Sequence, residues 1–298
     1  MMEIGVIGLG KMGFNLALNM IDNGVTVRGY DISESAKANS VDTGILFYDD
    51  LDGLIGELAQ KVFWVMLPSG EITENMLDTL LEKLPAGAIV IEGGNSNYKD
   101  SIRRGASFEE KGIAYLDVGT SGGTSGARNK ACLMIGGDSS AYEQLRSLFE
   151  KIAGVDGHLY AGKSGSGHFL KMVHNGIEYG MMQAIGEGFH ILEESDFDFD
   201  LEKVSHVWNH GSVIRSWLME LTEALFSESP KLEEYSGVVA ASGEGQWTVE
   251  SALELNVAAP VIALSVMLRS ISQQEDVFAN KVLAGLRNQF GGHGFVKK

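Results

Sequence analysis

Four polar residues in the middle of the chain have types and a spacing suited to proton transfer. Lys171, Asn175 and Glu178 stand at positions i, i+4 and i+7, with His174 at i+3, so a helix would place all four on one face. Such a face presents an amine, an amide and a carboxylate. Burial lowers the pKa of a lysine amine, which lets it act as a base for an alcohol. The same spacing is equally typical of a solvated Lys–Glu helix face.

A glycine-rich loop near the start of the chain fits the pattern G-x-G-x-x-G at Gly8, Gly10 and Gly13. In this pattern the glycines permit a tight turn, close approach of backbone N–H groups to a pyrophosphate, and close packing of a helix on a strand. Asp31 ends the next apolar run, where a carboxylate accepts hydrogen bonds from ribose hydroxyls and repels a 2′-phosphate. The alternative is a glycine-rich turn in another α/β protein. The predicted NAD ligands are Gly8, Leu9, Gly10, Lys11, Met12, Gly13 and Asp31.

The first half of the chain alternates two kinds of segment that would position these residues. Apolar, partly β-branched runs bounded by Gly or Pro predict strands at residues 4–7, 25–30, 62–67, 88–92, 114–118 and 132–136. Apolar residues that recur every three or four positions predict helices at 12–23, 71–83, 98–111 and 141–152. Alternating strands and helices are typical of a mostly parallel sheet covered by helices.

The pattern changes near Gly162, and helical periodicity dominates from Ser166 onward, as in residues 185–192, 213–226 and 257–271. The sequence therefore predicts two domains. Residues 1–163 form a Rossmann-type NAD-binding domain, and residues 164–298 form an all-helical domain for substrate binding and oligomerisation.

Composition argues against several classes of protein. A formal net charge of −17 argues against general binding to nucleic acid or to anionic membranes. The most apolar later run, residues 257–268, is far shorter than the roughly 20 residues that span a bilayer. No basic leader precedes the first predicted strand, so we expect a cytoplasmic protein. The single cysteine, Cys132, excludes a disulfide framework, and its apolar surroundings predict a place in the core.

Residues 157–164 also fit G-x-x-x-x-G-K-[ST], the phosphate loop of nucleoside triphosphatases. In such a loop the intervening residues must curl so that their N–H groups face phosphate. Residues 158–161 instead read as a short strand, and no long apolar strand leads into Gly157. We therefore reject the nucleotide-hydrolase interpretation.

Nearly the whole chain resembles the β-hydroxyacid dehydrogenase superfamily, and most closely the short form of the 6-phosphogluconate dehydrogenase family. The resemblance is carried by residues 8–13, 93–96, 117–123 with Gly126, 165–183, 243–248 and 287–293. The string from His174 to Tyr179 is the specific part. Relatives that act on hydroxyisobutyrate or tartronate semialdehyde share the catalytic lysine but usually lack this string.

The resemblance implies oxidative decarboxylation of 6-phosphogluconate to ribulose 5-phosphate and CO2, with reduction of NAD. Lys171 is then the base for the C3 hydroxyl, and its protonated form polarises the new ketone. Glu178 protonates C1 of the resulting enol, and Asn175 and Asn95 hold substrate hydroxyls and the nicotinamide region. Asn95 is thereby a further predicted NAD ligand. No metal is implied, because the lysine supplies the polarising charge.

The resemblance also assigns residues to the two anionic ends of the substrate. The turn at residues 121–123 offers N–H groups and a hydroxyl to the carboxylate. Tyr179, Arg269 and Arg287 hold the phosphate, because arginine offers a fixed donor fork and a permanent charge. The alternatives are a helix-surface role for Arg269 and a simple tail charge for Arg287. The complete set of implied substrate ligands is Asn95, Ser121, Gly122, Gly123, His174, Tyr179, Arg269, Arg287 and His293.

The sequence departs from the long form of the family at one position, and two alternative functions remain. Gln246 stands where the long form of the family usually has a phosphate-contacting lysine, which puts one phosphate ligand in doubt. A related dehydrogenase for another 3-hydroxy acid would act without decarboxylation, and a silent NAD-binding scaffold would not act at all. The presence of Lys171, Asn175 and Glu178 together weighs against the scaffold.

The resemblance finally implies intertwined subunits, and we expect a homodimer or homotetramer. Arg287 and His293 flank a flexible Gly pair in the tail, and the resemblance implies that they complete the active site of the neighbouring subunit. The alternative for these residues is a frayed terminus.

Overall fold

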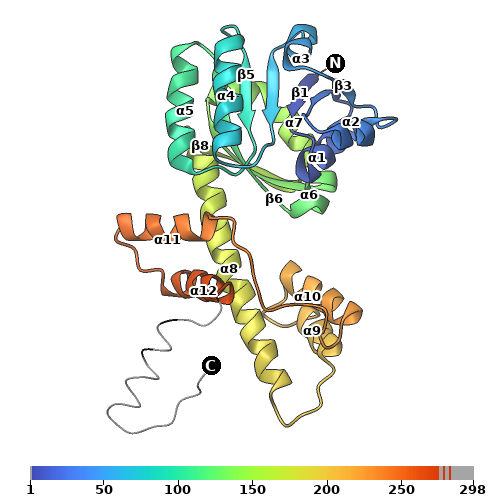
Figure 1. The fold of residues 1–298 in the computed structure, drawn as a ribbon, viewed down its shortest axis with the longest axis vertical. Coiled ribbons are helices and arrows are strands. Elements are labelled where there is room, and N and C mark those ends of the chain that lie inside the picture. Colours follow the sequence, from blue (N-terminus) through green and yellow to red (C-terminus); the bar gives the residue numbers. More distant parts are fainter. Residues whose placement is uncertain (1, 275–277, 279–281, 283–298) are drawn as a thin grey trace. The chain divides into compact units, whose positions relative to one another are not determined.

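The computed structural model describes residues 2–274, 278 and 282. The chain divides into two compact units, Met1–His174 and Asn175–Lys298 (Figure 1). The division falls inside one long helix, α8 (Ser166–Glu193), whereas the sequence predicts a boundary just before this helix. A helix that starts in one unit and continues into the other belongs to both.

The first unit is built on one sheet of eight strands in the order β3-β2-β1-β4-β5-β6-β7-β8. Every neighbouring pair is parallel except β6 with β7, which is antiparallel. The strands are β1 (Glu3–Ile7), β2 (Thr26–Tyr30), β3 (Leu46–Tyr48), β4 (Val62–Val65), β5 (Ile89–Glu92), β6 (Ala114–Ser121), β7 (Ala131–Gly137) and β8 (Ala153–Gly162). The predicted α/β fold with a mostly parallel sheet is confirmed.

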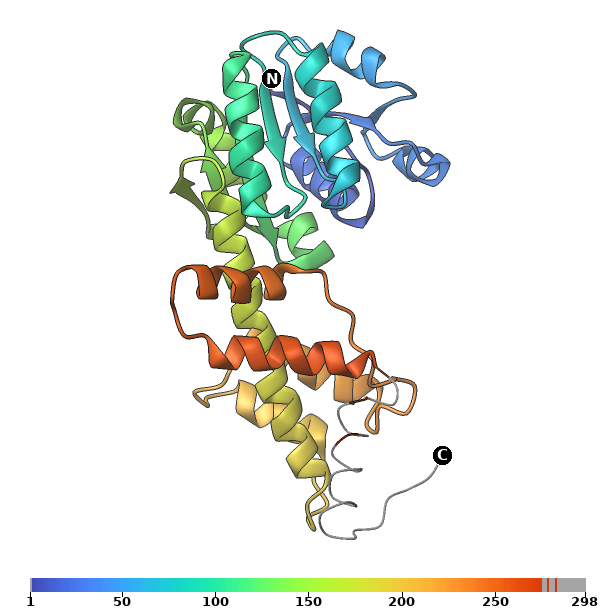
Figure 2. The same cartoon turned by 60° about the vertical axis from the view of Figure 1, so that its left-hand side comes forward.

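Helices cover both faces of this sheet. They are α1 (Lys11–Asp22), α2 (Glu34–Ser40), α3 (Leu51–Glu57), α4 (Glu71–Lys83), α5 (Tyr98–Glu110), α6 (Gly123–Asn129) and α7 (Ser139–Ile152). One apolar cluster joins the sheet to α1 and α7, and a second joins the other face to α3, α4 and α5; α4 and α5 run side by side in Figure 2. Trp64 belongs to the first cluster and Phe63 to the second, and both are 0% exposed. Burial of β4 on both faces explains its unbroken apolar sequence.

The described part of the second unit contains helices and no strand: the continuation of α8, then α9 (Leu201–Asn209), α10 (Trp217–Glu228), α11 (Glu244–Glu254) and α12 (Pro260–Ser272). The predicted all-helical character is confirmed for these residues. Phe189 of α8 packs against Phe226 of α10, with ring centroids 5.0 Å apart, in a small core. No helix of the described residues is both long enough and apolar enough to span a membrane.

Three sequence-based predictions need correction. The short elements β3, α2, α3 and α6 were missed, because segments of three to seven residues show too few repeats for a period to be recognised. Helix α10 begins after Ser216 rather than at Val213, because the Ser216 hydroxyl caps it by accepting from the Met219 N–H at 3.1 Å. Cys132 is exposed, since it alternates along β7 with the buried Ala131 and Leu133.

Candidate active site

The glycine loop has the geometry that a dinucleotide needs. Gly8 has φ +93°, and a Cβ there would lie 2.4 Å from the Met66 carbonyl oxygen. A Cβ on Gly13 would lie 2.0 Å from the Gly8 carbonyl oxygen. Gly10 differs, because a Cβ there would meet nothing within 4 Å, and Gly10 caps α1 with no side-chain hydrogen bond. The first N–H groups of α1 are therefore open to a pyrophosphate, so the loop fits the cofactor.

Asp31 lies beside this loop and fixes it. One carboxylate oxygen accepts from the Leu9 N–H at 2.6 Å, and the other accepts from the Ser33 N–H at 2.8 Å. Each oxygen keeps further lone-pair capacity for a hydroxyl donor. The residues that follow, Ile32 to Glu34, include no cation, and Ile32 is 89% exposed. This edge of the loop is therefore anionic.

Lys171 lies where α8 crosses the backbone of β6. Lys171 is buried, with only 5% of its surface exposed. A Cβ on Gly119 of β6 would lie 2.3 Å from the Lys171 Cβ, and a Cβ on Gly167 would lie 2.3 Å from the Asp117 carbonyl oxygen. Only glycines at these two positions allow the helix to approach the strand so closely. The predicted helix through Lys171, His174, Asn175 and Glu178 is confirmed as α8.

Asp117, within β6 and 0% exposed, anchors the start of α8. Its two carboxylate oxygens accept from the Gly165 N–H at 2.7 Å and from the His168 N–H at 2.9 Å. Burial raises the pKa of the Asp117 carboxyl above its ordinary value. A carboxylate at a helix N-terminus satisfies N–H groups that the helix leaves unpaired. The position of Lys171 thus depends on a residue of the sheet.

A second buried carboxylate, Glu92, ends β5 and is 0% exposed. One of its oxygens accepts from the Gly94 N–H at 2.8 Å, and the other lies 3.3 Å from an Arg104 nitrogen. His168 Nδ1 lies 3.5 Å from the same oxygen and 2.7 Å from the Ser101 hydroxyl. Glu92 therefore connects the loop before Asn95 with the first turn of α8.

Four residues of this network are not among the predicted site residues: Glu92, Arg104, Asp117 and His168. A signal was present for the two carboxylates, because Asp117 interrupts and Glu92 ends an apolar run that predicts a buried strand. A charge inside such a run must have a partner. For Arg104 and His168 the chain offers no comparable signal.

The loop after β5 brings Asn95 to the end of β6. Asn95 has φ +55°, and its side-chain oxygen accepts from the Thr120 N–H at 3.0 Å. The next residue of β6, Ser121, has its hydroxyl 3.3 Å from His174 Nε2 on α8. The predicted turn at residues 121–123 is the end of β6 and the start of α6, with positive φ at Gly122 and Gly123. The first unit thus gathers Asn95, Ser121 and His174 near one strand end.

The second unit gathers the predicted phosphate ligands that lie within the described residues. Tyr179 of α8 is 6% exposed, and the Arg269 guanidinium of α12 lies 3.5 Å from the centre of its ring, a cation–π contact. A Cβ on Gly245 of α11 would lie 2.6 Å from the same ring. Gln246, next along α11, bonds Glu250 at 2.8 Å and is exposed. Arg287 and His293 lie outside the described residues.

Comparison with protein-family models identifies the chain. Residues 3–162 match the NAD binding domain of 6-phosphogluconate dehydrogenase. Residues 167–292 match the C-terminal domain of the same enzyme. The chain belongs to the 6-phosphogluconate dehydrogenase family. The resemblance inferred from the motifs and the NAD-binding character of the first domain are thereby confirmed.

Individual relatives agree with this assignment. The YqeC protein of Bacillus subtilis is 53% identical over the full length of both chains. An NAD(+)-dependent, decarboxylating 6-phosphogluconate dehydrogenase of Haloferax volcanii is 43% identical over all of this chain and 99% of its own. The structure of Plasmodium falciparum 6-phosphogluconate dehydrogenase is similar with a TM-score of 0.84 and 29% identity. That comparison covers 99% of this chain and 66% of the longer one.

Proposed function

We propose that the protein oxidises 6-phospho-D-gluconate at C3, releases CO2 and forms D-ribulose 5-phosphate while reducing NAD. The observation that carries the proposal is the buried Lys171, seated on β6 at the start of the helix that also bears Asn175 and Glu178. The relative from Haloferax volcanii, which matches over the full length, has this activity in its name.

The residues of the chain divide the chemistry between them. NAD, when bound at the glycine loop, supplies the acceptor for the hydride from C3. Lys171 removes the proton of the C3 hydroxyl and, as an ammonium, hydrogen-bonds the new ketone oxygen. The carboxylate carbon then leaves as CO2, and its bonding electrons form the double bond of an enol. The Lys171 ammonium gives its proton to the ketone oxygen in this step and takes it back when the enol becomes the product ketone. Glu178 donates a proton to C1 of this enol, and Asn95, Ser121, His174 and Asn175 hold the substrate.

The decisive assay incubates the protein with 6-phosphogluconate and either NAD or NADP, and measures the reduced cofactor and CO2 together. We expect equal amounts of CO2 and NADH. Reduction without CO2 would show a related dehydrogenase that does not decarboxylate, and the absence of both products would show a binding protein.

The anionic edge at Asp31 predicts a higher kcat/KM for NAD than for NADP. Replacing Asp31 by Ala and Ile32 by Arg removes the repelling carboxylate and adds a cation for the 2′-phosphate. We expect the ratio of the two constants to move toward NADP by at least about tenfold, about 1.4 kcal/mol. Glu34→Ala, which removes a nearby charge of α2 without touching the loop, is the matched control. Equal or better use of NADP by the unaltered protein would contradict the prediction.

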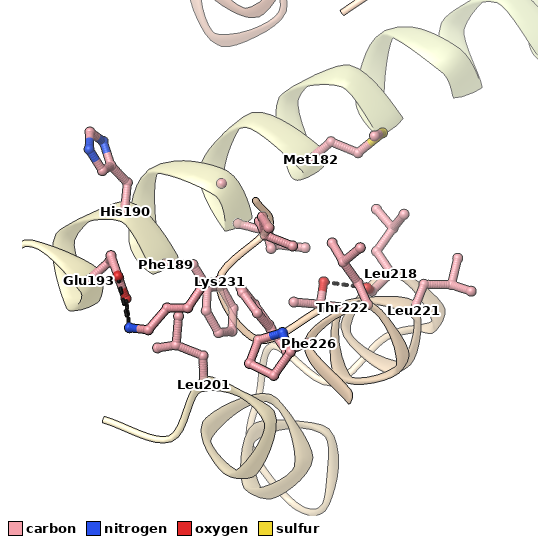
Figure 3. Close-up of a pocket in the computed structure, with 15 residues that line it drawn as sticks. Met182, Phe189, His190, Glu193, Leu201, Leu218, Leu221, Thr222, Phe226 and Lys231 are labelled. Carbon is pink, nitrogen blue, oxygen red and sulfur yellow. Dashed lines mark hydrogen bonds and ion pairs between the residues drawn. The ribbon is translucent and has the colours of Figure 1, made fainter. Parts of the chain in front are cut away.

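We further propose that the protein is a homodimer or a larger homo-oligomer, because the second unit exposes much apolar surface. A cavity of about 510 Å³ opens between α8 and α10, lined mostly by apolar side chains such as Phe189, Leu221 and Phe226 (Figure 3). Along α12, the residues Val261, Leu264, Met267 and Ile271 are between 49% and 69% exposed. Exposed apolar patches of this kind mark protein–protein interfaces.

Subunit mixing tests both the assembly and the proposed role of the tail. Lys171→Met and Arg287→Ala should each be inactive alone. If Arg287 serves the site of the partner subunit, a hybrid dimer has one site with both defects and one with neither. Activity should therefore reappear after subunit exchange. Fully exchanged hybrids that stay inactive would show that each tail serves its own subunit.

A further inference from the structure

Two histidines and a glutamate meet where α9 packs against α10, and none of them has a part in the proposed reaction. His206 and His210 are four positions apart at the end of α9, with ring centroids 4.2 Å apart. Glu223 of α10 places a carboxylate oxygen 2.7 Å from His206 Nδ1. One potential ligand atom from each of the three residues lies within 4.8 Å of the other two.

The hydrogen bond of the His210 ring leaves one of its nitrogen lone pairs available to a ligand. His210 Nδ1 lies 2.7 Å from the backbone carbonyl oxygen of His206. A carbonyl oxygen can only accept, so Nδ1 carries the hydrogen and Nε2 of the neutral ring carries the lone pair. Metal-binding histidines characteristically donate their second ring N–H to a backbone carbonyl or a carboxylate in this way.

We propose that His206, His210 and Glu223 bind a divalent transition-metal ion of the Zn²⁺ class. Imidazole and carboxylate together suit Zn²⁺, and three protein ligands with water in the fourth position complete its tetrahedron. The expected metal–ligand distances are about 2.0–2.2 Å. The His206 side chain is 57% exposed, so it can turn to meet the ion. The Glu223 carboxylate and the net charge of −17 favour a cation. The bound ion would join α9 to α10.

Titration of the full-length protein with ZnCl2 by calorimetry, after removal of metal with EDTA, tests the proposal. A Cys132→Ser background removes the exposed thiol, which could bind zinc by itself. We expect one site per chain, and a higher melting temperature when zinc is present. His206→Ala, His210→Ala and Glu223→Gln should each weaken the site by at least about tenfold and diminish the thermal shift.

His190→Ala is the matched control. The His190 side chain is 77% exposed, and its Nε2 lies 3.7 Å from a Glu194 carboxylate oxygen. This pair has one histidine and one carboxylate, as His206 and Glu223 do, but is not part of the proposed site. We expect this variant to bind zinc as the parent does. Binding by the parent that is no tighter than binding by the His206→Ala, His210→Ala double variant would overturn the proposal. Unchanged affinity in Glu223→Gln would overturn the assignment of Glu223 as the third ligand. NAD-linked turnover is not the readout, so the outcome is independent of the proposed reaction.

Discussion

Replacement of Lys171 by Met is expected to lower turnover of 6-phosphogluconate by about 10²–10⁴-fold, the usual contribution of a positioned base. The proposed roles put two demands on this amine, since it removes the hydroxyl proton and then stabilises the oxygen of the ketone. Met has a similar length and no charge, so it should fill the buried space beside Gly119 with little change in packing. The measurement is the rate of NADH formation in a single turnover.

Two further measurements show whether the loss of turnover in Lys171→Met arises in the chemical steps. NAD affinity should stay nearly constant in Lys171→Met, because the predicted cofactor contacts lie in the loop after β1, at Asp31 and at Asn95, and do not include Lys171. Glu178→Gln should leave the single turnover of hydride transfer largely intact and slow the later release of product, since Glu178 acts on the enol. Near-normal turnover by Lys171→Met would refute the assignment of Lys171 as the base.

The parts of the site that could be predicted from the sequence are those encoded by local spacing. The G-x-G-x-x-G loop is short, and each of its glycines answers a local steric demand, such as the positive φ of Gly8. The spacing of Lys171, Asn175 and Glu178 likewise needs only a continuous helix. Both patterns were recognisable before any tertiary contact was known. The family resemblance then supplied roles that spacing alone left open.

The parts that could not be predicted depend on contacts between distant segments. Glu92, Arg104 and His168 come from β5, α5 and α8, and no local pattern shows that they meet. The exposure of Cys132 depends on which face of β7 is covered, and its apolar neighbours do not reveal this. The candidate site residues could thus be proposed from the sequence, whereas the buried network of Glu92, Arg104 and His168 is visible only in the fold.

That network predicts the largest effect on stability. Arg104 is 4% exposed, and it bonds Glu74 at 2.7 Å, Glu92 at 3.3 Å and the Ser96 hydroxyl at 3.1 Å. Arg104→Leu would leave the fully buried Glu92 without its cation. Removing one partner of a buried ion pair costs about 3–5 kcal/mol, so we expect the free energy of unfolding in urea to fall by that amount. Because Arg104 and Glu92 hold the loop before Asn95, kcat should fall as well.

Arg103, next to Arg104 in the chain, provides the matched control, and Glu74, which both arginines bond, makes the stability depend on pH. Arg103 also bonds Glu74, at 2.6 Å, but is 53% exposed, so Arg103→Leu should cost only about 0–1 kcal/mol. Hydrogen bonds from Arg103 and Arg104 lower the pKa of Glu74 from 4.5 to about 2.

A carboxyl whose pKa is lower in the folded state stabilises the fold above its unfolded pKa and loses that contribution as the pH falls. The ion pairs of Glu74 should therefore stabilise the protein fully above pH 4.5 and progressively less toward pH 2. Glu74→Gln should reduce this acid sensitivity, and Arg104→Leu should reduce it in part, because Arg103 remains. Equal unfolding free energies for Arg103→Leu and Arg104→Leu at neutral pH would contradict the prediction, because burial of Arg104 would then not determine its contribution to stability. The buried network would in that case have no special part in holding the loop before Asn95.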